Sequence, residues 1–205
     1  MRLDPFYLIV DSAAWLERLI PLGVRLVQLR IKDMPHAALR EEIRRSRILC
    51  AGAGCQLIIN DYWQIAIDEG CDFVHLGQED LAEADVAAIR AAGMKLGIST
   101  HDEAELETAL AAEPDYVALG PVYPTILKQM KWAPQGLNKL SVWRRRIGTL
   151  PLVAIGGLTL DRLDGVFFHG ADSAAVVTDI SLNARPEDRT RKWIEKTAKR
   201  RGDPA

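Results

Sequence analysis

The sequence has few cysteines, little net charge and no long hydrophobic run, and each shortage excludes a class of protein. Its three cysteines, Cys50, Cys55 and Cys71, are not spaced as CxxC, which argues against a disulfide framework or a structural zinc site. The net charge of -2 offers no broad positive surface for nucleic acid or an anionic membrane. No window reaches the roughly 18 consecutive apolar residues of a membrane span. We therefore expect a cytoplasmic protein with small-molecule substrates and no nucleic-acid or membrane partner; a homo-oligomer is left open.

A glycine-rich nucleotide-binding turn is also missing, because the residues after Val10, DSAAW, contain no GxGxxG. Short apolar runs that are typical of strands buried on both faces recur instead, with helix-like stretches between them. They begin near Phe6, Leu26, Gln56, Phe73, Lys95, Tyr116, Pro151 and Ser173. About eight strand and helix pairs predict an α/β fold, a single-domain (β/α)8 TIM barrel over residues 1–205. The alternative, an open doubly wound sheet, would need fewer strands.

Three local patterns refine this prediction. Thr100 and Glu103 fit a capping box at the start of a helix. The basic residues from about 196 to 205 are expected to form a frayed tail. Residues 121–137 contain three prolines and no strand pattern, which predicts a long loop over the active rim. The apolar side chains of this loop, Trp132 among them, could face a substrate or a neighbouring loop.

Two carboxylates follow consecutive expected strands. Asn60 and Asp61 end the third strand, and Asp80 follows the fourth. Parallel strands end on the same rim of a barrel, so these side chains are expected to lie close together. Two carboxylates and an amide suit a hard cation such as Mg²⁺, which often bridges to substrate phosphates. Asp80 has a plainer explanation as well, since an Asp after a strand is often the N-cap of the next helix.

The second expected strand carries three polar residues in alternation. Gln28, Arg30 and Lys32 should point to one side, toward the barrel or its mouth, and Ile31 to the other. Two buried cations require an anion. A polyanionic ligand is favoured over an internal ion-pair network, because Lys32 should sit near the rim.

The later strand ends suggest a second anion site. Gly156 and Gly157 allow backbone amides to approach an anion, and Thr178 ends the eighth strand, where barrels often bind phosphate. Ser99 could bind a ligand or cap a helix, and the same holds for His101. His75 lies within the fourth strand, where a core imidazole is favoured over a ligand.

Several motifs resemble the thiamine phosphate synthase (thiamine-phosphate pyrophosphorylase) family, in order and over nearly the whole chain. They are VQLRIKD, LIINDYWQIAIDEGCDFVHLGQEDL, GISTHDEAE, PDYVALGPVYPT followed by Lys128 and APQG, PLVAIGG, and GADSAAVVT. The resemblance implies a phosphate-binding barrel that uses Mg²⁺ to join hydroxymethylpyrimidine diphosphate to a thiazole phosphate. Diphosphate would leave first, and the thiazole nitrogen would capture the resulting pyrimidine cation.

Matched position by position, the resemblance also implies residue roles. It makes Asp61 and Asp80 the Mg²⁺ ligands. It assigns the diphosphate to Gln28, Arg30, Lys32, Asn60 and Lys128, and the thiazole phosphate to Thr125, Gly157, Val177 and Thr178. Arg30 and Lys128 would stabilise the charge that grows on the leaving group, and Ser99 would contact the pyrimidine or its diphosphate.

The chain departs from the family pattern at three positions. Ile31 replaces a common Glu, Tyr62 a common Arg, and Leu127 a common Thr that can bind phosphate. The Leu127 change predicts weaker binding of the thiazole phosphate. Two alternatives are kept: a thiazole tautomerase-like isomerase using a histidine near His101, and a non-catalytic paralogue that holds a thiazole or thiamine phosphate.

Overall fold

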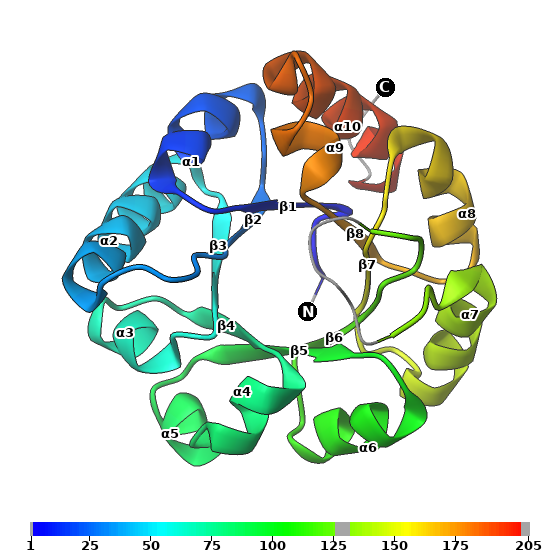
Figure 1. The fold of residues 1–205 in the computed structure, drawn as a ribbon, viewed down its shortest axis with the longest axis horizontal. Coiled ribbons are helices and arrows are strands. Elements are labelled where there is room, and N and C mark those ends of the chain that lie inside the picture. Colours follow the sequence, from blue (N-terminus) through cyan, green and yellow to red (C-terminus); the bar gives the residue numbers. More distant parts are fainter. Residues whose placement is uncertain (1, 126–131, 202–205) are drawn as a thin grey trace.

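The computed structural model describes residues 2–125 and 132–201, and over these residues the chain forms a closed barrel of eight parallel strands (Figure 1). The strands are β1 (Phe6–Val10), β2 (Leu26–Leu29), β3 (Gln56–Asn60), β4 (Phe73–Leu76), β5 (Lys95–Thr100), β6 (Tyr116–Leu119), β7 (Leu152–Ile155) and β8 (Ser173–Val176). β8 pairs with β1, Leu8 facing Val176, which closes the sheet. The predicted (β/α)8 barrel is confirmed.

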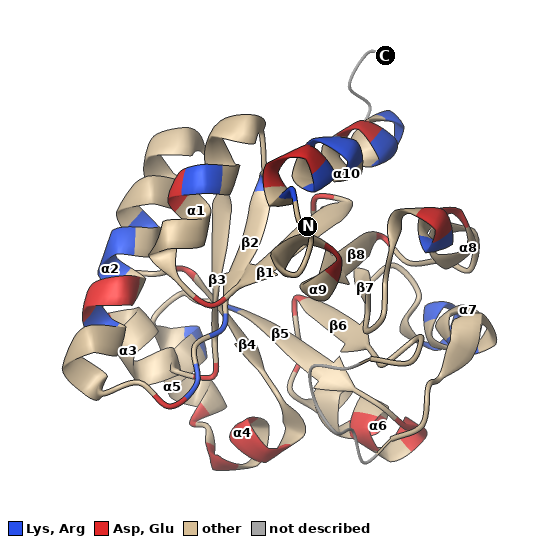
Figure 2. Cartoon of the chain, turned by 45° about the horizontal axis from the view of Figure 1, so that its top comes forward, with Lys and Arg blue, Asp and Glu red and all other residues tan. Residues whose placement is uncertain are grey.

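Helices surround the barrel and connect successive strands (Figure 1). They are α1 (Ala13–Leu19), η1 (Ile20–Leu22), α2 (His36–Ala53), α3 (Trp63–Asp68), α4 (Gln78–Glu83), α5 (Val86–Ala91), α6 (Glu103–Ala111), α7 (Gly136–Ile147), η2 (Leu160–Arg162), α8 (Leu163–Phe168), α9 (Thr178–Ser181) and α10 (Pro186–Arg201). Figure 2 shows that most charged residues lie on the helices and loops rather than on the strands.

One local prediction was wrong, and another differs in its bounds. The capping box at Thr100 does not form, because β5 continues through Thr100 and the Asp102 side chain caps α6 by accepting from the Glu105 N–H at 2.9 Å. The tail expected from about residue 196 is helical through Arg201. Arg201 is tied to the start of the chain, its Nη2 donating to Asp4 Oδ1 at 2.8 Å. Residues 202–205 lie outside the described residues.

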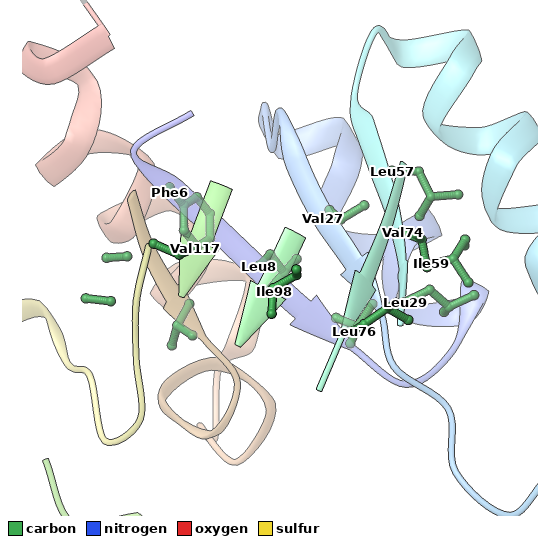
Figure 3. Packing of buried hydrophobic residues seen from close by; sticks show 14 of the residues in the cluster. Phe6, Leu8, Val27, Leu29, Leu57, Ile59, Val74, Leu76, Ile98 and Val117 are labelled. Carbon is green, nitrogen blue, oxygen red and sulfur yellow. The ribbon is translucent and has the colours of Figure 1, made fainter. Parts of the chain in front are cut away.

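Alternation along the strands separates two apolar layers. One layer lies between the barrel and the helices, and Figure 3 shows strand side chains such as Leu8, Val27 and Ile59 that belong to it. The other layer fills the barrel with the side chains of Tyr7, Ile9, Leu26, Ile58, Phe73, Tyr116, Ala118, Val153 and Ala175. The inner layer forms the floor of any site at the carboxyl ends of the strands.

Tyr116 fits inside the barrel because the neighbouring strand carries glycine at position 97. A Cβ there would lie 2.2 Å from the Tyr116 ring, which is fully buried and packs edge-on against Phe73 and Tyr7. We expect Gly97→Ala to lower the free energy of unfolding by about 2 kcal/mol through overpacking, measured by urea denaturation. Gly52→Ala is the matched control, because a Cβ at this helical position meets no atom within 4 Å; an equal loss there would refute the packing argument.

Candidate active site

A cavity of about 450 Å³ lies at the carboxyl ends of the strands, and the predicted site residues gather in it. Those that line it are Gln28, Arg30, Lys32, Asn60, Asp61, Asp80, Ser99, Thr125, Gly157, Val177 and Thr178. Lys128 and Leu127 lie outside the described residues. The residues after β3 and β4 face those after β7 and β8 across the ring of strands, because three strands lie between β3 and β7, and between β4 and β8, in either direction.

The acidic end of the cavity is formed by Asp61 and Asp80. Asp61 follows β3 in the left-handed region, with φ of 66°, and its N–H donates to the His75 carbonyl at 2.9 Å. Its Oδ2 receives Lys32 Nζ at 2.5 Å. A non-glycine residue with positive φ carries a conformational cost, and such strained backbone conformations are common at functional sites. The ion pair with Lys32 compensates part of the charge at this end.

Asp80 lies in the first turn of α4, whose N-cap is Gly77, so its interpretation as the N-cap was wrong. Burial, followed by the neighbouring Asp61 carboxylate, raises the pKa of Asp80. Lys32 acts in the opposite direction and does not cancel these effects. The two carboxylates therefore repel each other in a partly dry setting, and an oxygen-seeking cation would relieve that repulsion.

The protein alone does not complete a coordination shell. Within residues 2–125 and 132–201, no three His, Cys, Asp or Glu side chains come together as a metal-binding cluster. A cation between Asp61 and Asp80 would need further oxygen ligands from water or from a bound substrate. Mg²⁺ commonly has such a shell, with one or two carboxylates, waters and substrate phosphates. The donor set thus fits Mg²⁺.

The predicted alternation on the second strand is confirmed, except that one of the three polar residues lies deeper in the barrel than expected. Ile31 is buried in the outer apolar layer, while Gln28, Arg30 and Lys32 line the cavity. Gln28 sits deeper than expected, inside the barrel, where its Nε2 donates to Tyr7 Oη at 2.9 Å. Arg30 lies exposed beyond the end of β2, and its guanidinium has no ion-pair or hydrogen-bond partner in the described part of the chain. It is free to meet an anion.

The floor of the cavity contains buried polar groups that the sequence analysis missed. Tyr7 Oη lies 3.0 Å from Tyr116 Oη, which lies 2.7 Å from His75 Nδ1; His75 Nε2 lies 2.8 Å from Ser99 Oγ. Burial lowers the pKa of His75 to about 4, so the ring is neutral at pH 7. The interpretation of His75 as a satisfied core imidazole is confirmed. Alternation within FYLIV and YVALG was the signal that could have placed both tyrosines inside the barrel.

Beyond Ser99, the wall of the cavity contains a carboxylate and imidazole pair. His101 Nδ1 lies 2.7 Å from Glu105 Oε2, and the ring stacks on Trp132 with centroids 5.7 Å apart. Trp132 therefore contacts the turn after β5, as one of the two alternatives has it, and it also lines the cavity; that it faces a substrate stays a prediction. Glu105 was missed, although its spacing of four residues from His101 on an expected helix was a signal.

The glycine-rich end of the cavity is built by the turns after β6 and β7. Gly157 has φ of +65°, and a Cβ there would lie 2.4 Å from the Pro124 carbonyl oxygen. Arg162 donates to the Gly157 carbonyl and lies over the Tyr123 ring, 4.3 Å from its centroid. The turn is thus fixed in a form that only glycine fits, with its backbone at the cavity wall.

The adjoining turn after β8 is held in place by contacts with α10. Val177 and Thr178 begin α9, where the first backbone N–H groups have no acceptor within the helix. The next residue, Asp179, accepts both nitrogens of an Arg189 fork at 2.8 Å and the Trp193 indole N–H at 2.7 Å. These contacts anchor the turn to α10 and leave its N–H groups at the cavity.

We expect Gly157→Ala to raise the KM for the phosphate ligand of this end about tenfold or more, since the turn must shift. The KM for a ligand bound at the Asp61 and Arg30 end should change less than threefold. Steady-state kinetics with one substrate varied at a time measures both. Gly93→Ala, with φ of +73° but no atom within 4 Å of its Cβ, controls for backbone strain alone. Equal changes in both KM values would contradict the assignment.

In the described part of the chain, none of the helices is both long and apolar enough to cross a membrane.

The fold and the cavity define a class: single-domain (β/α)8 barrel enzymes with the site at the carboxyl ends of the strands. Residues 6–180 match the model of the thiamine monophosphate synthase family. The chain is 73% identical over 198 residues, 97% of each chain, to a thiamine-phosphate synthase of Rhizobium etli, and 47% identical to one of Neisseria meningitidis, with 89% of each chain covered. The chain therefore belongs to the thiamine monophosphate synthase family and is an enzyme, a transferase.

A solved structure agrees on the fold. The thiamine phosphate pyrophosphorylase from Pyrococcus furiosus superposes with a TM-score of 0.85 over 96% of each chain, at 23% sequence identity. At that identity the match concerns the architecture alone.

Proposed function

We propose that this enzyme joins hydroxymethylpyrimidine diphosphate to a thiazole phosphate, with Mg²⁺, to give thiamine phosphate and diphosphate. The observation that carries the proposal is that one cavity has two different ends. Arg30 and the Lys32 and Asp61 ion pair line one end together with Asp80, and fixed glycine-rich turns line the other. Two anionic substrates could bind there side by side, with their reacting atoms between.

The diphosphate would bind at the end formed by β2, β3 and β4. Arg30 offers a planar fork that suits phosphate oxygens and has no side-chain partner among the described residues, and Lys32 and Asn60 line the same cavity. Asp61 and Asp80 would hold Mg²⁺, which when bound supplies charge neutralisation of the diphosphate. Lys128, outside the described residues, is proposed as a further diphosphate ligand on the strength of its motif. Ser99 would contact the pyrimidine or its diphosphate.

The reaction we propose is dissociative. The bond between the pyrimidine methylene carbon and the diphosphate oxygen breaks, and its electron pair leaves with the diphosphate. Arg30 stabilises the charge that grows on that oxygen. The lone pair of the thiazole nitrogen then forms the new C–N bond with the pyrimidine cation. Transfer of this kind needs no protein nucleophile and no proton from the chain.

The thiazole phosphate would bind at the other end. Backbone N–H groups at Gly157, Val177 and Thr178 and the Thr125 hydroxyl are available to its phosphate. The stacked His101 and Trp132 rings would form an aromatic wall beside the reacting atoms. Such a wall limits access of water to the cation, which would otherwise be lost by hydrolysis.

The test is to incubate purified protein with both substrates and Mg²⁺ and to measure thiamine phosphate and diphosphate together. Equal amounts of the two products, formed only when both substrates and Mg²⁺ are present, support the proposal. Absence of product at high enzyme concentration would reject it. Conversion or tight binding of a thiazole phosphate without a pyrimidine substrate would favour the isomerase or the non-catalytic alternative.

A further inference from the structure

Four consecutive hydrogen bonds cross the interior of the barrel and end at the cavity. They join Gln28 on β2, Tyr7 on β1, Tyr116 on β6, His75 on β4 and Ser99 on β5. The first four of these side chains are buried. Buried polar groups in the inner layer are costly unless satisfied, and this row satisfies them in series.

The row has a preferred direction, which begins with Tyr116. A phenol is a better donor than acceptor, and an unprotonated imidazole nitrogen is a good acceptor, so the 2.7 Å contact has Tyr116 Oη donating to His75 Nδ1. Tyr116 has one hydrogen and therefore accepts from Tyr7. Tyr7 in turn accepts from the Gln28 amide, whose facing atom is Nε2, a donor. Each group thus donates toward His75.

The opposite direction fails at the far end of the row. If Ser99 donated to His75 Nε2, the ring would carry its hydrogen on Nδ1 and donate to Tyr116. Tyr116 would then donate to Tyr7, and Tyr7 would point its hydrogen at Gln28 Nε2. Two donors would meet in the barrel interior, unless the amide turned over. The orientation of the Gln28 amide, with Nε2 toward Tyr7, therefore agrees with donation toward His75.

We propose that Tyr116 and His75 are positioning residues that hold the Ser99 hydroxyl as a hydrogen-bond donor to the bound pyrimidine substrate. With Nδ1 occupied as an acceptor, His75 carries its hydrogen on Nε2 and donates to Ser99 Oγ. The Ser99 hydrogen is then directed away from His75 and into the cavity, which Ser99 lines. The ligand atom that meets it must be an acceptor, an unprotonated ring nitrogen or a diphosphate oxygen. This assignment of a ligand to Ser99 rests on the proposed function; the direction of the row does not.

The direction is measured in the ligand-free protein, labelled with ¹⁵N-histidine, by NMR at neutral pH. The four histidines are assigned by replacing His36, His101 and His169 one at a time. We expect the directly bonded proton of His75 on Nε2 and an unprotonated Nδ1. A proton on Nδ1 instead would overturn the proposal. This result stands whether or not the protein makes thiamine phosphate.

Two conservative variants test the positioning role. Tyr116→Phe removes the hydroxyl that fixes the His75 ring. We expect kcat/KM for the pyrimidine diphosphate to fall about tenfold, while the KM for the thiazole phosphate stays unchanged. His75 protonated on Nδ1 should also appear in the NMR spectrum. Tyr7→Phe removes an equally buried hydroxyl but leaves Tyr116 donating to His75, so the ring should keep its Nε2 proton and kcat/KM should fall no more than about twofold.

Equal kinetic losses in both variants would attribute the effect to general loss of core hydrogen bonding and would overturn the positioning role. An unchanged His75 spectrum in folded Tyr116→Phe would do the same. If Tyr116→Phe does not fold, the NMR result on the unaltered protein decides the direction. Absence of thiamine phosphate with the unaltered protein would reject the proposed function and leave the measured direction of the row intact.

Discussion

Asp80→Asn is expected to lower the Mg²⁺-dependent rate of thiamine phosphate formation by at least about 100-fold, because it removes one of the two carboxylates proposed to hold the cation. The amide is close to the carboxylate in size and shape, so the loss reports charge rather than packing. Steady-state rates across a range of Mg²⁺ concentrations measure it. Glu83→Gln, on the exposed side of the same helix, should keep the rate within twofold.

The stability of Asp80→Asn separates a metal site from a structural one. Folding raises the pKa of Asp80, so ionising this carboxyl at neutral pH opposes folding, and the neutral amide should melt no lower than the unaltered protein without metal. The difference should close as the pH falls through that pKa, since the carboxyl is then neutral as well. Added Mg²⁺ should raise the melting temperature of the unaltered protein and not of the variant. A full rate in Asp80→Asn, or an equal metal-induced rise in both proteins, would remove Asp80 from the metal site.

The positions of the main site residues could be predicted from the sequence because parallel strands impose one rule. Every strand of the barrel ends on the same rim, so a residue just after an apolar run, such as Asp61 or Gly157, is placed at the cavity without any tertiary information. Alternation along a strand also predicts the face to which each side chain points, and it correctly placed Arg30 and Lys32 toward the cavity and Ile31 away from it. Short, strongly patterned runs carry this information locally.

What escaped prediction depends on contacts between distant strands. The buried row through Tyr7 and Tyr116 joins β1 to β6, which are not neighbours in the sheet, and alternation within each strand gives the side of a residue but not the partner that it meets across the barrel. The cap of α6 moved to Asp102 because β5 pairs with β6 through Thr100, a matter of tertiary register. Boundaries of this kind are decided by pairing and not by local propensity.

Arg30→Ala should lower kcat by about 100-fold to 1000-fold, an effect as large as the one expected for Asp80→Asn. Arg30 lines the same cavity as the acid pair, and its guanidinium has no partner among the described residues, so its fork is available to the leaving diphosphate. Lys32, in contrast, is already paired with Asp61 at 2.5 Å and is less available to a phosphate. Because charge on the bridging oxygen grows as the C–O bond breaks, the loss should appear in kcat more than in KM.

Arg30→Lys separates the contribution of the planar guanidinium geometry from that of the positive charge. A lysine keeps the positive charge but cannot bind two phosphate oxygens in a fixed plane, so it should recover only part of the rate lost in Arg30→Ala. Arg145→Ala, at an exposed position on α7 outside the cavity, controls for loss of a surface cation and should keep kcat within twofold. Single-turnover measurements with both substrates saturating isolate the chemical step. If Arg30→Ala kept kcat within about threefold, charge stabilisation would have to come from other groups at this end of the cavity, and the role given to Arg30 in breaking the C–O bond would be wrong.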